Sequence, residues 1–399
     1  MRLAPRLDQV KPSPTLMVTV KVAALRREGI EVIDFGAGEP DFDTPEHIKD
    51  AAIAALKQGK TKYTPVGGTA DVKEAIIAKL QRDNGLEYAL PEVTTGCGGK
   101  HILFNAFHAL VGPGDEVLIP APYWVSYSDI VVLAGGTPKL LPTTEDTGFK
   151  MTAAQLHAAL GPHSKVLLLN SPSNPTGAAY TEDELSRIAE VIESSELFTI
   201  SDDVYEKFLY DAPRCAHLLS LKPGLRDRLL VANSVSKTYA MTGWRLGYAA
   251  GPREVIKAME TIQSQSTSNP NSIAQAAAIE ALTGDQGPVG VMAKEFAQRR
   301  NYVVDRLRAI PGISCTLPEG AFYVFPRVAG CFGPQWQGKT IASAMDLSLY
   351  LLEEAKVALV AGEGFGSAEH VRISYATSMQ NLEQGLNQLE AALQRLSGA

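Results

Sequence analysis

Short apolar runs recur through the middle of this 399-residue chain, and each ends in glycine or in a polar loop. They lie at residues 115–122, 164–175, 197–205 and 228–236. Runs of this kind are typical of buried parallel strands. Amphipathic stretches of helical length accompany them, at 98–111 and at 181–195, where Thr181 and Glu184 form a capping box. We therefore expect a doubly wound α/β sheet with its ligand site at the strand ends.

Composition narrows the class of protein. With 45% hydrophobic and 20% charged residues, the chain resembles an ordinary soluble globular protein. Its net charge of −7, without a block of Lys and Arg, argues against nucleic-acid or anionic-membrane partners and favours small molecules. No signal peptide and no apolar run of roughly 18 residues is visible, so we expect a cytoplasmic protein. No metal site is expected either, because the cysteines are scattered, at Cys97, Cys215, Cys315 and Cys331.

One lysine, Lys237, stands among hydroxyl and apolar residues in "SVSKTYAMTGWRLG" (residues 234–247). A single lysine is most often a solvated surface residue, but Ser234, Ser236 and Arg245 could hold a phosphate dianion beside its amine. A lysine that forms a Schiff base next to an anchored phosphate suggests pyridoxal 5′-phosphate, whose ring nitrogen needs an acidic partner. The stretch "SDDVY" (201–205), at the end of an apolar strand, offers an aspartate for that role.

Five motifs together resemble those of the aspartate aminotransferase family, the class I aminotransferases of PLP fold type I. In chain order they are "FGAGEPDFDTP", "NSPSNPTG", "SDDVYE", "SVSKTYAMTGWRLG" and "VRISYATS", and the likeness extends from Lys11 to Ser378. The resemblance implies a large domain with a mostly parallel seven-stranded sheet between helices, and a smaller α+β domain. We expect an N-terminal arm and the first part of the small domain in 1–48, the large domain in 49–290, and the rest of the small domain in 291–399.

The resemblance also assigns roles around the cofactor. Lys237 would form the Schiff base and later move the proton between the substrate Cα and the cofactor. Because the family spacing is Asp followed three residues later by Tyr, Asp202 would pair with the pyridine nitrogen and Tyr205 would donate to the phenolic oxygen. Asn174 would be the second donor there, and Trp124 would stack on the ring. Asp203 occupies a position where the family more often has glutamate.

The same comparison assigns a phosphate site and a dimer. The residues expected around the phosphate are Gly98, Gly99 and Lys100 at a helix N-terminus, with Ser234, Ser236 and Arg245. Tyr63 would reach the phosphate of a neighbouring subunit, and Asn269 lies in the family's inter-subunit loop. Both imply a homodimer with shared sites.

Arg372 resembles the family arginine that binds the substrate α-carboxylate, helped by the backbone amide of Gly38. The arginine that reads the distal carboxylate in animal-type enzymes is replaced by Ser264, whereas the bacterial subgroup uses a lysine that corresponds to Lys100. We therefore expect transfer of the amino group between L-aspartate and 2-oxoglutarate. Lys11, with Thr15, extends the expectation to prephenate, because a cation at position 11 accompanies prephenate acceptance in that subgroup.

Several alternatives stay open. An aromatic or alanine aminotransferase, or a PLP-dependent β-lyase, could use the same scaffold. A PLP-sensing regulator would need an attached DNA-binding module, for which the chain has no room. The segment "GPQWQGKT" (333–340) satisfies the Walker A pattern, but Pro334 removes an amide and Trp336 is bulky at the loop's centre, so we expect no nucleotide site there.

Overall fold

The computed structural model describes residues 3–10 and 14–398 of the chain. Its main feature is a seven-stranded sheet in the order β2-β8-β7-β6-β5-β3-β4. The strands are β2 (Val93–Gly96), β3 (Glu116–Ala121), β4 (Thr137–Pro142), β5 (Ser164–Asn170), β6 (Phe198–Asp202), β7 (Leu229–Ser234) and β8 (Gly247–Ala250). Six of them run in the same direction, and β8, which pairs antiparallel with both of its neighbours, runs in the opposite direction. The expected mostly parallel seven-stranded sheet is thus confirmed.

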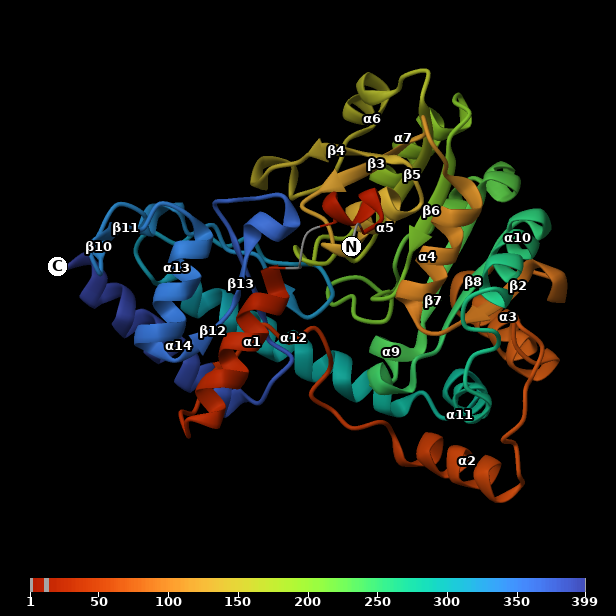
Figure 1. Cartoon of the computed structure of the whole chain (residues 1–399), viewed down its shortest axis with the longest axis horizontal. Helices are drawn as coiled ribbons and strands as arrows, with labels where there is room; N and C mark the ends of the chain where they lie inside the picture. The colour runs from red at the N-terminus through yellow and green to blue at the C-terminus, as the bar shows by residue number, and fades with distance from the viewer. Residues whose placement is uncertain (1–2, 11–13, 399) are drawn as a thin grey trace.

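Helices cover both faces of this sheet (Figure 1). The helices in this part of the chain are α2 (Glu46–Lys57), α3 (Ala70–Asn84), α4 (Gly99–Leu110), α5 (Ser126–Leu133), α6 (Ala153–Ala159), α7 (Glu182–Glu193), α8 (Leu218–Leu221), α9 (Val235–Thr238), α10 (Arg253–Ser264) and α11 (Ser272–Thr283), of which α2 packs mainly against α11. Successive strand residues point to opposite faces. Val166 accordingly packs in a cluster with residues of α4, α5 and α10, while Leu167 packs in the cluster that includes α7 and α11.

A second group of elements is built from the two ends of the chain, and Figure 1 shows the red helix α1 beside the blue C-terminal elements. Its helices are α1 (Pro14–Arg27), α12 (Gly287–Arg308), α13 (Ala344–Tyr350) and α14 (Met379–Ser397). Its strands are β1 (Ile33–Asp34), β9 (Tyr323–Val324), β10 (Gln335–Trp336), β11 (Lys339–Thr340), β12 (Val357–Ala358), β13 (Val360–Ala361) and β14 (Val371–Ser374). β13, β14 and β9 form an antiparallel sheet, and β1 pairs in parallel with β12. The exact domain limits stay predictions.

Short helical turns link these elements. The 3₁₀ segments are Pro5–Asp8, Leu90–Glu92, Glu145–Thr147, Pro223–Arg228, Thr242–Trp244, Ala329–Cys331 and Gly362–Phe365, and a π-helical turn covers Leu351–Ala355. The predicted capping box is present, because Thr181 accepts from the Glu184 amide while the Glu184 carboxylate accepts from the Thr181 amide at 2.8 Å. This reciprocal cap fixes where α7 begins.

The Walker-like segment folds as a hairpin. β10 and β11 pair antiparallel within it, and the turn places Gln337 and Gly338 at positive φ. A P-loop instead joins a strand directly to a helix, whereas α13 begins only at Ala344.

None of the helices in the described ranges is long and apolar enough to cross a membrane.

Candidate functional site

A cavity of about 390 Å³ lies at the carboxyl ends of the parallel strands. Three neighbouring strands each end on a polar residue that lines it: Asn170 on β5, Asp202 on β6 and Ser234 on β7. Strand register places Asn170 directly beside Asp202. Because strand ends leave side chains and backbone groups free for ligands, this edge is where an α/β sheet binds small molecules.

Lys237 reaches the cavity from α9, a single helical turn that follows β7 directly. Ser234 caps this turn, since its hydroxyl accepts from the Ser236 amide at 3.3 Å. The Lys237 ammonium donates to the Gly38 carbonyl at 2.5 Å. Burial, partly opposed by Glu39 and assisted by Arg245 and Arg372, lowers the pKa of Lys237 to about 8. Lys237 can therefore exchange a proton near neutral pH, as a general base must.

Asp202 forms the acidic end of the cavity and is almost fully buried. The Tyr127 hydroxyl donates to its carboxylate at 2.7 Å, and the Asn170 amide donates to its backbone carbonyl at 2.8 Å. Burial, partly opposed by the hydrogen bond from Tyr127 and assisted by the charge of Asp203, raises the pKa of Asp202 to about 6. A carboxylate kept in so apolar a place favours a cationic ligand atom.

Gly98, Gly99 and Arg245 lie close together and have the chemistry that suits an anion. Gly98 caps the N-terminus of α4 with a φ of +92°, and a Cβ built there would come within 2.4 Å of the Arg245 guanidinium. The free amides and dipole of a helix N-terminus favour an anion, and Arg245 adds a formal charge. Lys100 follows in the same helix and lies over the Trp124 ring at 4.9 Å. Partial burial lowers the pKa of Lys100, and Arg245 lowers it further.

Arg372, on β14, is 4% exposed and faces the same cavity. Its guanidinium donates to the Asn174 side chain at 3.0 Å and to the Gly36 carbonyl at 2.8 Å. Its Nε is buried and has no hydrogen-bond partner among the described residues. The guanidinium also lies 4.6 Å from the Tyr323 ring centre. The fork is thus oriented by protein groups and keeps capacity for one more acceptor, such as a carboxylate.

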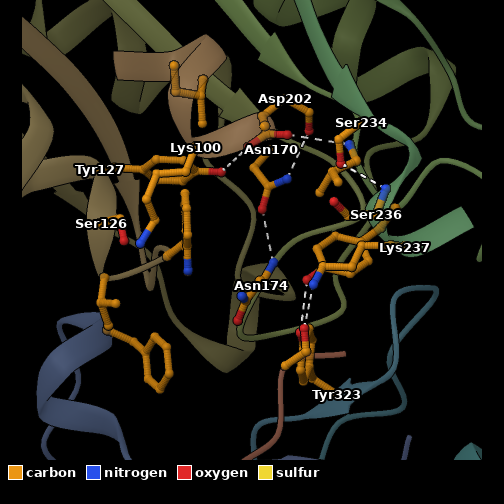
Figure 2. A pocket seen from close by; sticks show the side chains of 18 of the residues that line it. Lys100, Ser126, Tyr127, Asn170, Asn174, Asp202, Ser234, Ser236, Lys237 and Tyr323 are labelled. Carbon is orange, nitrogen blue, oxygen red and sulfur yellow. Dashed lines mark hydrogen bonds between the residues drawn. The ribbon is translucent and has the colours of Figure 1, made fainter. Parts of the chain in front are cut away.

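The structure brings most of the predicted site residues into this one cavity (Figure 2). Those that line it are Gly38, Gly99, Lys100, Trp124, Asn174, Asp202, Tyr205, Ser234, Ser236, Lys237, Arg245 and Arg372. Gly98 adjoins it. Their binding roles stay predictions.

Other predicted residues lie elsewhere. Tyr63 is 94% exposed and points away from the core, and the Asn269 side chain donates to the Pro270 carbonyl at 2.8 Å. Ser264 ends α10. Lys11 lies outside the described residues; Thr15 falls within α1, but its side chain is outside them too.

Four polar residues of the cavity were not predicted from the sequence: Ser126, Tyr127, Asn170 and Tyr323. Figure 2 shows Tyr127, Asn170 and Tyr323 beside Asp202, Asn174 and Lys237, and each of these three makes a hydrogen bond within the site. Asn170 could have been predicted from the sequence, because it ends an apolar strand whose carboxyl end lies at the same sheet edge as Asp202. In the described ranges, no group of three or more His, Cys, Asp or Glu side chains could hold a metal ion.

Comparison with known proteins agrees with this geometry. The family model "Aminotransferase class I and II" matches residues 30–389. An aspartate aminotransferase from Rhizobium meliloti is 49% identical over 99% of this chain and 97% of its own length. An aspartate/prephenate aminotransferase from Cereibacter sphaeroides is 50% identical over 99% of both chains.

Solved structures give the same result. The aspartate aminotransferase of Rhizobium meliloti superposes with a TM-score of 0.96 at 49% identity, over 99% of this chain and all of the other. The Thermus thermophilus aspartate aminotransferase with maleate gives 0.92 at 40% identity, over 98% of this chain and all of the other. Since the family model and these relatives each span nearly the whole chain, the protein belongs to the class I and II aminotransferase family.

Proposed function

We propose that this chain is an aspartate aminotransferase that transfers the amino group between L-aspartate and 2-oxoglutarate with pyridoxal 5′-phosphate (PLP) as its cofactor. The observation that carries the proposal is the convergence of Lys237, Asp202 and Arg372, from three separate elements, on one cavity. The names of the similar proteins, aspartate aminotransferases, support L-aspartate as the amino donor.

The residues present fit this cofactor. Asp202 is a buried carboxylate whose raised pKa would fall beside a cationic ring nitrogen. The contact between Gly98 and Arg245 leaves no room for a Cβ, as expected where backbone amides must approach an anion closely. The unpartnered Nε of Arg372 has capacity for a substrate carboxylate.

When bound, PLP supplies an aldehyde carbon that accepts the amino group and a ring that withdraws electrons from the substrate Cα. Asp202 would hold its ring nitrogen, Ser234, Ser236, Arg245 and the Gly98–Gly99 turn its phosphate, and Trp124 its ring face. Tyr205 and Asn174 would hold the phenolic oxygen. With a pKa of about 8, the Lys237 amine can take the proton from the substrate Cα and deliver it to the cofactor.

Substrate recognition would rest on two cations. Arg372 would bind the α-carboxylate, with Gly38 beside it, and Lys100 at the mouth of the cavity would meet the distal carboxylate of aspartate. Ser264 has no charge with which to bind the distal carboxylate. We extend the proposal to prephenate through Lys11 and Thr15, because aspartate/prephenate aminotransferases are among the similar proteins.

We further propose a homodimer with shared sites, located in the cytoplasm. Tyr63 is 94% exposed, and an aromatic side chain so fully in solvent is suited to contact another subunit. Its hydroxyl would reach the phosphate of the partner's site, with Asn269 at the same interface. The cysteines are free thiols, which suits a reducing compartment.

The direct test is an absorption spectrum of the purified, PLP-loaded protein before and after addition of L-aspartate. We expect a cofactor band that converts to the amino form of the cofactor, together with oxaloacetate in the medium. In Lys237→Ala we expect the conversion to slow by roughly 10⁴-fold or more. Folded protein that binds no PLP would contradict the proposal. Faster conversion of L-alanine or L-phenylalanine, or release of ammonia as in β-elimination, would refute the aspartate assignment.

Prephenate use is tested by Lys11→Ala, assayed with prephenate and with oxaloacetate as amino acceptors. We expect a selective loss of kcat/KM for prephenate, since Lys11 would meet only its ring carboxylate. Arg6→Ala is the matched control, because it removes another cation of the N-terminal segment. An equal loss on both acceptors would refute the selective role of Lys11.

A further inference from the structure

We propose that Tyr323 is a positioning residue that turns the Tyr205 hydroxyl proton toward the phenolic oxygen of the cofactor. The inference rests on the proposed function, which places that oxygen next to Tyr205. Figure 2 shows Tyr323 pointing into the cavity toward Lys237. The residue stands on β9, in a segment of the sequence that contains none of the predicted site residues.

The contact between the two tyrosines is short and enclosed. Their hydroxyl oxygens are 2.8 Å apart, and both side chains are buried. The rings meet edge to face with centroids 5.7 Å apart, and Phe322 packs against both of them. Ring packing of this kind leaves the hydroxyls little freedom except rotation of their hydrogens. The direction of the shared hydrogen bond is therefore what distinguishes one state of the pair from another.

Counting protons decides that direction. Each tyrosine has one hydroxyl hydrogen, and only one of the two can lie between the oxygens. If Tyr205 donated to Tyr323, it would have none left for a phenolate on its other side. If Tyr323 donates, Tyr205 both accepts and donates, and the chain of hydrogen bonds strengthens its second bond. Tyr323 as donor is thus the arrangement that lets Tyr205 serve the cofactor.

Arg372 favours Tyr323 as the donor. Tyr323 pairs with Ser374 across the β9–β14 ladder, so Arg372 is its diagonal neighbour on the same face. The guanidinium 4.6 Å from the ring makes the hydroxyl a better donor. Burial raises the pKa of both tyrosines, and Arg372 opposes the rise. The other charged groups facing the pair are Asp202 on β6, Glu39 in the N-terminal segment and Lys237 on α9.

The test is a pH titration of the cofactor absorbance in the PLP-loaded protein without substrate. Tyr323→Phe keeps the ring and removes the donor, so the phenolic oxygen should become more basic. We expect the titration midpoint to rise by roughly 0.5 pH unit, a smaller rise than in Tyr205→Phe. Tyr375→Phe is the matched control, because its hydroxyl is equally buried but donates to the Ala321 carbonyl at 3.1 Å. It should leave the midpoint unchanged.

A double variant separates positioning from general packing. If Tyr323 acts through Tyr205, adding Tyr323→Phe to Tyr205→Phe should give no further shift. Replacing Tyr323 by 3-fluorotyrosine keeps the fold and makes the hydroxyl more acidic, so the midpoint should move down. An unchanged midpoint in Tyr323→Phe and with fluorotyrosine, or additive shifts in the double variant, would overturn the inference. Absence of a cofactor band in the wild-type protein would instead refute the proposed function.

Discussion

Two parts of the cavity are assembled in different ways. We call the part around Gly98, Ser234 and Arg245 the anion end, and the part around Arg372, where a substrate carboxylate would bind, the carboxylate end. At the anion end, Ser234, Ser236 and Lys237 come from one turn, and β7 and β8 bring Arg245 and the Gly98 turn next to it. At the carboxylate end, Arg372 is held by Asn174 from the loop after β5 and by the Gly36 carbonyl, residues more than 190 positions away in the chain. The first end depends on local backbone shape, the second on how distant segments pack.

The backbone itself forms the wall at the anion end. A Cβ on Gly247 would lie 2.5 Å from the Gly98 carbonyl carbon, so the two turns approach as closely as glycine allows. At the carboxylate end the wall includes aromatic rings, with the ring centres of Tyr323 and Phe365 at 4.6 and 5.1 Å from the guanidinium. We therefore expect substitutions at the anion end to change cofactor affinity and those at the carboxylate end to change substrate turnover.

Arg372→Lys should give the largest effect of the three variants considered next. Lysine keeps the charge but loses the planar fork, and kcat/KM for L-aspartate should fall about 100-fold. Cofactor affinity, followed by absorbance titration with PLP, should change little. Arg327→Lys is the control, because that guanidinium pairs with Glu369 and is partly exposed. A comparable loss of PLP affinity in Arg372→Lys would show that the two ends are not separable.

Asp202→Asn should have opposite effects on stability and on cofactor binding. Folding raises the Asp202 pKa from 3.8 to about 6, so the folded apoprotein holds this proton more tightly than the unfolded chain. The contribution of Asp202 to the stability of the folded apoprotein is therefore most favourable below pH 4, and it falls as the pH rises to about 6.

At pH 7.5 the Asp202→Asn apoprotein should be more stable than wild type, by roughly 1–3 kcal/mol in urea unfolding. The gain should disappear near pH 4, and PLP should bind the variant more weakly because the partner of the ring nitrogen is lost. If the stability of the variant minus that of wild type were lower at pH 7.5 than at pH 4, burial of the Asp202 charge would not destabilise the folded apoprotein.

Gly98→Ala should give the smallest effect, limited to the anion end. Alanine at a φ of +92° is strained and its Cβ would displace Arg245, so PLP affinity should fall roughly tenfold. Saturated with PLP, the variant should keep most of its turnover. Gly243→Ala provides the control, because its Cβ would meet nothing within 4 Å. Equal PLP affinity in both variants would argue against an anion at Gly98.

The two ends also differ in how far the sequence predicts them. The Lys237 turn, the strand end at Ser234 and an aspartate at the end of the strand before it follow from apolar periodicity and neighbouring residue types, because these contacts are local. The family resemblance then selects Asp202 over Asp203. Tyr127 and Tyr323 do not, since an aromatic residue in an apolar stretch has the same pattern whether it lines a cavity or a core. Only the pairing of β9 with β14 places Tyr323 against Arg372. The family resemblance, in contrast, predicts Arg372 from its motif.

We propose that one cavity holds the cofactor and the substrate together. A crystal structure of the protein with PLP and maleate, a dicarboxylate that resembles the substrate in charge, would show this arrangement. We expect the pyridine nitrogen within hydrogen-bond distance of Asp202, the phosphate on Ser234, Ser236 and Arg245, and one maleate carboxylate on Arg372. A cofactor bound away from Asp202, or maleate that leaves Arg372 free, would contradict the account.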